Sequence, residues 1–351
     1  MRSPWNPLLL VIAYHKIRNV LHTYQFVQAI MNAQIDRLSA LLERFRARAH
    51  LFHQGPLCGL TQFAAQPGRG FLHVLRRGDL ELRHPPGAGL PGRLRFEEPT
   101  LLFYPRPIHH MFHNSPVEGS DFTCAALDFD GGARNPVVRA LPPLIALPLA
   151  RVAGLEQALA LLFAEAEQVR CGHRLLADRL FEVVLIQLLR WLIDHHQEAG
   201  IQAGLIAGLS DPRLARALVA LHEDPGAAWD LPRMAEHAGM SRSAFAAAFR
   251  RIVGQPPADY LTDWRLSLAQ AQLRLGRPVK SVAVELGYAN ASALSRAFSA
   301  RLGESPRQWL EREDAGREAE PTGQLSSGEA AAGLLPSPAG GRGVRGEGRS
   351  V

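Results

Sequence analysis

The sequence predicts an α+β protein with an N-terminal antiparallel β-barrel or sandwich, connecting helices and a C-terminal all-α domain. Three observations support this fold class. Short apolar runs separated by Gly and Pro fill residues 63–127, a pattern typical of antiparallel strands. Residues 155–195 contain almost no Gly or Pro and place apolar side chains at helical spacing. Residues 231–310 contain an internal repeat whose helix caps and Gly turns are typical of helix-turn-helix units.

The composition is that of a globular chain. Of the 351 residues, 47% are hydrophobic and 21% are charged, which excludes a disordered, collagen-like or polytopic membrane protein. At roughly 150 residues per domain, this length predicts two domains. The longest apolar run near the start, residues 8–13, is far shorter than the roughly 20 residues that span a bilayer, so we expect no membrane partner. Three widely spaced cysteines outside any C-x-x-C motif favour a reducing, cytoplasmic location.

The N-terminal half begins with an extension that fits no domain pattern. This poorly defined segment covers residues 1–30, and Met31 opens a cleaner amphipathic helix. Our hypothesis is therefore that Met31 is the true start. Residues 31–148 hold the predicted strands and form the first domain.

The remainder of the chain divides into three parts. Residues 149–210 are a helical connector with two helices broken near Cys171 and Gly172. Their apolar faces either bury within the chain or form the surface of a homodimer. Residues 211–312 hold the repeat, and residues 313–351 predict a disordered tail because large apolar side chains are scarce there.

The repeat consists of two copies of one structural unit. Phe249 and Phe298 are separated by 298 − 249 = 49 residues. The same offset relates four further pairs: Gly254 and Gly303, Pro257 and Pro306, Tyr260 and Trp309, and Leu261 and Leu310. Upstream, an offset of 48 relates Gly239 to Gly287 (287 − 239), so the second copy is longer by one residue, as a turn permits.

Each copy predicts a helix, a Gly turn and a second helix. In the first copy, Asp230 caps a helix over 231–238, Gly239 reverses the chain, and Ser241 caps a helix that ends near residue 251.

In the second copy, a helix over 280–286 stops at Gly287, and Asn290 caps a helix that runs to about residue 302. Residues 257–273 predict one long amphipathic helix between the copies. A rigid spacer of this kind would fix the separation of the two second helices, which are the expected reading helices.

Charge points to double-stranded DNA as the partner. Only Lys16 and Lys280 are lysines, so nearly all the positive charge is arginine, which pairs bidentately with phosphate and guanine. Residues 213–312 hold 14 Lys and Arg against 9 Asp and Glu, a net of 14 − 9 = +5. The residues that we expect to contact DNA lie in or next to the reading helices: Ser241, Arg242, Ser243, Arg250, Arg251, Asn290, Ser292, Ser295, Arg296 and Ser299.

Among these residues, Arg242 and Arg296 are the strongest candidates for base contact. The alternative for each exposed arginine is a phosphate contact or a solvated side chain. Four other arginines suit phosphate contact or solubility better than base readout: Arg250, Arg251, Arg274 and Arg301.

Residues 230–310 resemble the double helix-turn-helix domain of the AraC/XylS family of bacterial transcription regulators. The resemblance implies a regulator that binds promoter DNA and a small-molecule effector, with RNA polymerase as a further partner and activation as a typical outcome. Leu294 departs from the family, which usually has Phe there, and alanines leave the first reading helix poor in polar side chains. The residues that carry the resemblance are Leu231, Ala235, Gly239, Ser241, Phe245, Phe249, Gly254, Pro257, Tyr260, Arg265, Ala283, Gly287, Tyr288, Ser292, Arg296, Phe298, Gly303 and Pro306.

The N-terminal half is similar to the cupin-like sensor domain that precedes this DNA-binding domain in many such regulators. Pro105, His110 and Asn114 fall in place in the second cupin motif, whereas Pro107 stands where Gly is usual. The first motif, which supplies two His and a Glu in enzymatic cupins, is reduced to His73.

The candidate effector or metal residues are His73, His109, His110, His113 and Cys124. Imidazole and thiolate suit zinc, copper or nickel. On a strand, however, His109 and His113 would share one face and His110 would take the other. The alternative is a polar strand end with Cys124 as a small buried residue.

Three functions remain open. The first is a regulator with no catalytic residue and no obligatory cofactor, in which the cupin-like domain senses an effector. The second is a cupin-type metal-dependent enzyme fused to a DNA-binding module, which would need about three protein ligands. The third is an architectural DNA binder without a ligand pocket.

Overall fold

The computed structural model describes residues 35–152, 154–167 and 170–319. The described residues up to Pro306 form one compact unit, and the described residues from Arg307 to 319 belong to a second. The N-terminal extension and the proposed start at Met31 lie outside the described residues. The first described helix, α2 (Ser39–Arg44), covers only the end of the amphipathic segment.

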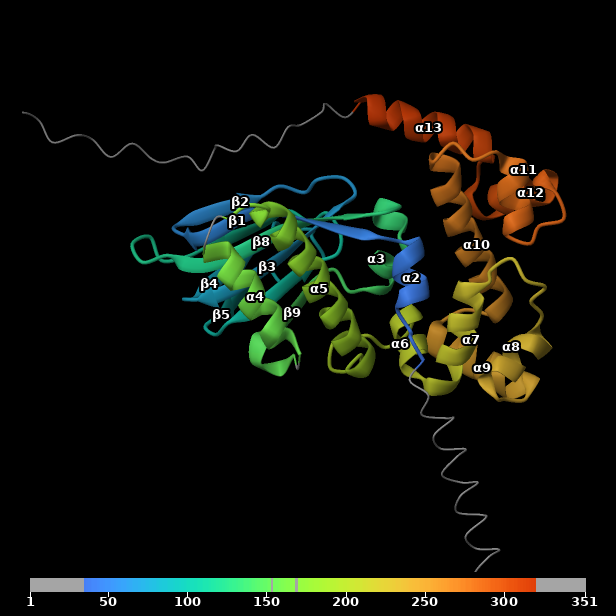
Figure 1. The fold of residues 1–351 in the computed structure, drawn as a ribbon, viewed down its shortest axis with the longest axis horizontal. Helices are drawn as coiled ribbons and strands as arrows, with labels where there is room; N and C mark the ends of the chain where they lie inside the picture. The colour runs from blue at the N-terminus through green and yellow to red at the C-terminus, as the bar shows by residue number, and fades with distance from the viewer. Residues whose placement is uncertain (1–34, 153, 168–169, 320–351) are drawn as a thin grey trace, which may run out of the picture. The chain divides into compact units, whose positions relative to one another are not determined.

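Two antiparallel sheets form the N-terminal part (Figure 1). Bulky β-branched and aromatic residues between Gly- and Pro-containing turns give the short strands. The five-stranded sheet has the order β1 (Ala47–Leu57), β8 (Ser120–Phe129), β3 (Arg69–Arg77), β6 (Thr100–Tyr104) and β9 (Ile145–Pro148). The four-stranded sheet has the order β2 (Leu60–Phe63), β7 (His110–His113), β4 (Leu80–Arg83) and β5 (Arg93–Phe96).

The core of this part contains side chains from both sheets. Phe71, Tyr104 and Phe122 from the five-stranded sheet belong to one buried cluster with Phe63 and Phe112 from the four-stranded sheet. Alternation along each strand sends every second side chain into this cluster. The sheet order therefore brings rings that are up to 59 residues apart (122 − 63) into one core.

Two helices cover the five-stranded sheet (Figure 1). They are α4 (Leu155–Glu167) and α5 (His173–Asp194), and the break between them falls at Gly172, which has a φ of 80° and begins α5. The predicted break near residues 171 and 172 is confirmed. Short helices η1 (Gly132–Arg134) and α3 (Pro136–Ala140) connect β8 to β9, and η2 (Leu149–Arg151) connects β9 to α4.

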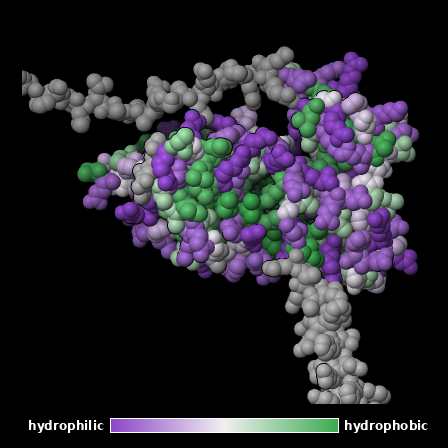
Figure 2. Space-filling view, viewed as in Figure 1, coloured by the Kyte–Doolittle hydropathy of each residue, from purple (hydrophilic) through white to green (hydrophobic). Residues whose placement is uncertain are grey.

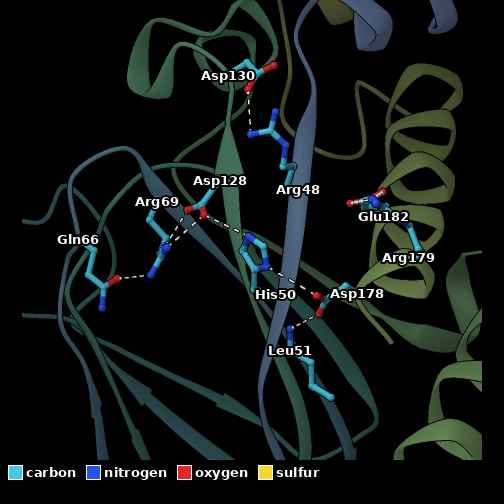
Figure 3. A network of polar contacts seen from close by, with 10 residues as sticks. All are labelled: Arg48, His50, Leu51, Gln66, Arg69, Asp128, Asp130, Asp178, Arg179 and Glu182. Atoms are coloured by element: carbon cyan, nitrogen blue, oxygen red, sulfur yellow. Dashed lines mark hydrogen bonds and ion pairs between the residues drawn. The ribbon is translucent and has the colours of Figure 1, made fainter. Parts of the chain in front are cut away.

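A polar network fastens α5 to the edge strand β1 (Figure 3). The register of β1 against β8 shifts between Leu51 and His53, so one residue of β1 is left out of the ladder. The backbone N–H of Leu51 donates to Asp178 of α5 at 2.7 Å. His50 lies between Asp178 and Asp128, with its ring nitrogens 3.6 Å and 3.4 Å from their carboxylate oxygens.

The C-terminal part is helical from residue 205 onward. The two predicted helix-turn-helix units and the spacer helix are all present. The helices are α6 (Leu205–Ser210), α7 (Pro212–Glu223), α8 (Leu231–Ala238), α9 (Arg242–Val253), α10 (Pro257–Arg274), α11 (Val279–Glu285), α12 (Ala291–Leu302) and α13 (Pro306–Ala319).

The structure differs from the sequence prediction at two places in this half. The connector 149–210, expected to contain two helices, ends in a third, because residues 205–210 form the buried helix α6. Residues 313–319, assigned to the disordered tail, continue α13, because Glu, Arg and Ala are strong helix formers and Pro306 starts the helix. Within α13, Arg307 Nε lies 2.8 Å from Glu311 Oε1, one helical turn away. Residues 320–351 of the predicted tail lie outside the described residues.

Candidate DNA-binding interface and sensor interior

Local capping fixes the first helix-turn-helix unit. The Asp230 carboxylate accepts the backbone N–H of Arg233 at 2.8 Å and caps α8. Gly239, with a φ of 64°, ends α8 in the left-handed conformation that turns of this kind require. Ser241 Oγ then accepts the backbone N–H of Ala244 at 3.3 Å, which starts α9. These residues are the ones on which the sequence prediction rested.

The second unit repeats this arrangement. Gly287, with a φ of 75°, follows α11, and Asn290 caps α12 by accepting the backbone N–H of Ala293 at 2.9 Å. Phe245 and Phe249 bury one face of α9, and Leu294 and Phe298 bury the corresponding face of α12. Leucine at 294 thus fills the buried position that the family usually gives to Phe.

The opposite faces of both helices are open. Of the expected contact residues, Ser241, Arg242, Ser243, Arg250 and Arg251 are exposed on the first unit. On the second unit, Asn290, Ser292 and Arg296 are exposed, whereas Ser295 and Ser299 are half-buried. The structure therefore places all ten on or beside the two exposed faces, and Ser241 and Asn290 also act as caps.

The arginines of these faces are available to an anion. In the described part of the chain, no ion pair with a carboxylate is found for four of these arginines: Arg242, Arg250, Arg251 and Arg296. Arg301 differs from them. Its Nε and Nη2 lie 2.6 Å and 2.9 Å from the two carboxylate oxygens of Asp263 on α10. This bidentate ion pair links α12 to the spacer helix, and the expectation that Arg301 serves phosphate contact or solubility stays a prediction.

Two histidines meet in the sensor interior. His73 of β3 and His110 of β7 are both fully buried, and their Nε2 atoms are 3.0 Å apart. His110 stacks on Tyr104 with ring centroids 4.0 Å apart, and its Nδ1 lies 2.8 Å from the carbonyl oxygen of Ile108. Burial among apolar rings lowers the pKa of His110 to about 3 and holds the pKa of His73 well below its ordinary value. Both rings are therefore neutral at physiological pH.

The other candidate sensor residues do not join this pair equally. Cys124 is buried opposite His73 in the strand register, and burial raises the pKa of its thiol. His113 is exposed on β7, on the face opposite to His110, and His109 precedes the strand. Sequence reasoning missed His84, whose Nε2 lies 2.8 Å from the Tyr104 hydroxyl, because no motif marks it.

This donor set does not fit a three-ligand metal centre. Among the described residues, no group of three or more His, Cys, Asp or Glu is placed to hold a metal ion. His73 and His110 supply two imidazoles, and the hydroxyl of Tyr104, which stacks on His110, is engaged by His84. The arrangement is an aromatic interior with two neutral nitrogen groups.

Comparisons with known proteins agree with both halves. A cupin family model matches residues 36–194, and a helix-turn-helix domain model matches residues 234–312. A putative AraC-like transcription regulator of Streptomyces antibioticus is 38% identical over 169 residues, which are 47% of this chain and 55% of the relative. The chain belongs to the AraC family. A second putative AraC-like regulator, from Streptomyces lividans, is 36% identical over 181 residues, 51% of this chain and 59% of the relative.

A further relative matches across both domains. The RCS-specific HTH-type transcriptional activator RclR of Escherichia coli (strain K12) is 27% identical over 248 residues, which are 68% of this AraC-family chain and 84% of that relative. The chain spans little more than half the length of the two Streptomyces relatives that it matches. In the described segments, every helix is too short or too polar to cross a membrane.

Proposed function

We propose that this AraC-family protein is a transcription regulator that binds double-stranded promoter DNA through α9 and α12 and binds a small effector through its cupin domain. The observation that carries the proposal is the pair of exposed faces on α9 and α12, which hold Arg242 in the first turn of α9 and Arg296 in the middle of α12. A helix anchored on one face by aromatic or leucine side chains can enter a major groove with the other.

The two reading helices contribute unequally to DNA recognition. α9 is rich in alanine, so its base readout rests on Arg242, with Arg250 and Arg251 suited to phosphate. α12 presents serines around Arg296, which can reach base edges or phosphate. The spacer helix α10 has 18 residues and is about 27 Å long at 1.5 Å per residue, a length comparable to one DNA turn of about 34 Å.

The sensor interior supplies the effector site in this proposal. Its buried core is aromatic, and His73 and His110 add ring nitrogens that burial keeps neutral, so the effector is an uncharged or weakly polar molecule rather than a metal. The signal leaves the sensor through β1 and α5, which Asp178 holds together (Figure 3). An effector acts only through a difference in its affinity for two arrangements of the chain.

A second copy of the chain is the proposed partner of the connector helices. Large apolar side chains on α4 and α5 are exposed, and Figure 2 shows apolar residues gathered over this face. They are Leu161, Leu175, Leu176 and Val183, which are 42–63% exposed. We further propose a cytoplasmic protein that acts on RNA polymerase, as the relatives' description as transcription regulators supports.

Binding to the DNA upstream of the protein's own gene tests this function. We expect the chain to bind that DNA at least about 10³-fold more tightly than random DNA, and both affinities to fall steeply with salt. Arg296→Ala should weaken binding to the preferred DNA by about 1–3 kcal/mol and reduce the preference over random DNA.

Arg179→Ala is the matched control, because it removes one exposed arginine from α5, where Arg179 pairs with Glu182 at 2.8 Å. It should leave binding unchanged. Equal loss of specific and random binding in Arg296→Ala would show that Arg296 contacts phosphate only. No preference for any DNA at any salt concentration would contradict the proposed function.

A further inference from the structure

The two helix-turn-helix units touch each other directly through backbone. The loop that precedes α8 passes so close to the end of α11 that a Cβ atom on Gly226 would lie 2.2 Å from the carbonyl oxygen of Glu285. A Cβ atom on Gly287 would lie 2.4 Å from the carbonyl oxygen of Gly226. Both distances are far inside van der Waals contact, so only glycine fits at either position. The units therefore share a contact that does not pass through the spacer helix.

Arg265 of α10 closes this contact. Its Nε donates to the carbonyl oxygen of Pro225 at 2.7 Å, and its Nη2 donates to the carbonyl oxygen of Ala227 at 2.9 Å. These carbonyls flank Gly226. The same guanidinium lies 5.7 Å from the ring centroid of Tyr288, directly after the turn of the second unit. One side chain thus holds the loop of the first unit and faces the turn of the second.

A second set of contacts ties the spacer helix to α11. Gln272 Nε2 donates to Glu285 Oε1 at 2.7 Å, and Arg277 Nη1 lies 2.7 Å from Glu285 Oε2. Glu285 contributes its side chain here, and its carbonyl oxygen meets Gly226. The end of α11 is accordingly held from the spacer helix and from the first unit at once.

We propose that Arg265, with Gly226 and Gly287, is a positioning clamp that fixes the relative placement of the two reading helices and hence the spacing of the DNA half-sites. This inference rests on the proposed function, since it requires both helices to bind one DNA molecule. Arg265 is half-buried, and both of its measured hydrogen bonds go to carbonyl oxygens of the chain, so its role is exercised through the loop and not through DNA.

The expected consequence is a loss of cooperation between half-sites. When one helix is bound, a rigid clamp keeps the second helix at its groove and gives it a high effective concentration. A loosened clamp lowers that concentration but leaves each reading face unchanged. Affinity for DNA with both half-sites should therefore fall, whereas affinity for DNA with one half-site should not.

The probes are a DNA duplex that the wild-type full chain enriches from a random library and two versions of it with one half-site scrambled. Arg265→Ala should bind the intact duplex at least tenfold more weakly than wild type and each scrambled version within threefold of wild type. One added base pair between the half-sites should lower the DNA affinity of the wild type at least tenfold and that of Arg265→Ala less than threefold. This relaxed spacing is a readout that general destabilisation would not produce.

A pair of glycine variants keeps the test independent of Arg265. Gly287→Ala should reproduce the relaxed spacing, because its Cβ pushes the loop away. Gly303→Ala is the matched control, since Gly303 has a φ of 80°, similar to 75° at Gly287, but nothing lies within 4 Å of its Cβ position. Circular dichroism confirms folding of each variant before binding is measured.

The outcomes separate this inference from the proposed function. Wild-type protein that prefers no enriched duplex over random DNA contradicts the proposed function, and the clamp with it. If the wild type prefers the enriched duplex but Arg265→Ala loses the same factor of affinity for the intact and scrambled duplexes, only the clamp is contradicted. Unchanged spacing dependence in both Arg265→Ala and Gly287→Ala would likewise overturn it.

Discussion

Inside the sensor, His73 and His110 remain uncharged because a proton on either ring would be buried among aromatic side chains without a carboxylate partner. His222 in the C-terminal half is uncharged for the same reason. It is fully buried, its Nε2 lies 2.6 Å from the Tyr260 hydroxyl, and burial lowers its pKa to about 3. Three histidines are therefore neutral in the folded chain and titrate at their ordinary pKa of 6.5 when the chain unfolds.

These histidines predict a stability that falls with acidification. Their folded pKa lies below the unfolded value, so the unfolded state binds more protons between pH 6.5 and about 3. The free energy of unfolding should be highest above about pH 6.5 and should decrease as the pH falls from there toward 3. Each such histidine steepens the slope by up to about 1.4 kcal/mol per pH unit. Urea unfolding at a series of pH values measures this slope.

His110→Phe keeps a ring on Tyr104 and removes one titrating group, so its slope should be shallower than that of the wild type. Identical slopes in wild type and His110→Phe would show that His110 is already protonated or exposed in the folded chain.

Single residues also show the limit of sequence reasoning. His73 and His110 could be named as candidates from the cupin-like motifs, but their contact across 37 positions (110 − 73) depends on two different sheets. Arg301 looks like any other arginine of a basic domain, and the resemblance that includes Arg265 does not say what Arg265 binds. Only their partners, a carboxylate on α10 and two carbonyls of a loop, separate them from the arginines of the reading faces.

At the scale of elements, Asp178 links α5 to the edge strand β1. It accepts the backbone N–H of Leu51, next to the register shift between Leu51 and His53. Such an N–H would otherwise lack a partner in a half-buried place. The β1 strand was outside the region in which the sequence predicted strands, because its charged and His residues hide the alternation.

Removal of this link should loosen α5 from the sheet. Asp178→Ala should lower the free energy of unfolding by about 1–2 kcal/mol, the usual cost of losing a hydrogen bond to a carboxylate. Asp194→Ala provides the control on the same helix, because Asp194 is 68% exposed and its ion pair with Arg37 spans 4.0 Å. Such a pair contributes little, and chemical denaturation should detect no change above about 0.5 kcal/mol. Equal effects of the two substitutions would argue against a specific link at Leu51.

The helices of the two helix-turn-helix units and the spacer between them were predicted to within a few residues. Caps at Asp230, Ser241 and Asn290 and turns at Gly239 and Gly287 are local signals that act within three or four residues. α6 was missed because it has only six residues and no capping side chain, and its stability comes from burial against neighbouring helices.

For the whole molecule, the exposed apolar face on α4 and α5 raises the question of assembly. Isolated apolar residues on a surface are ordinary, but a group of four on two adjacent helices favours contact with another protein surface. The proposed partner is a second copy of the chain. Palindromic or directly repeated DNA sites would then be bound by two chains together.

Leu175→Glu together with Val183→Glu should abolish self-association, because each charge would be desolvated in the dimer. Sedimentation velocity should show the wild type as a dimer and the double variant as a monomer of native secondary structure. Val117→Glu, at a position 87% exposed in the sensor, should remain dimeric. A monomeric wild type, or a double variant that still dimerises, would place the assembly surface elsewhere or remove it.

The sequence by itself determined the two-part α+β organisation and the helix-turn-helix repeat, because caps, turns and helical periodicity are encoded within a few positions. It also named ten residues expected to contact DNA, and those contacts stay a prediction. The tertiary structure alone decided which polar groups meet. The His73 and His110 contact, the Asp178 link to β1, the Asp263 and Arg301 pair and the Arg265 clamp each join residues distant in sequence. Such pairings depend on sheet order and helix packing, which no local pattern specifies.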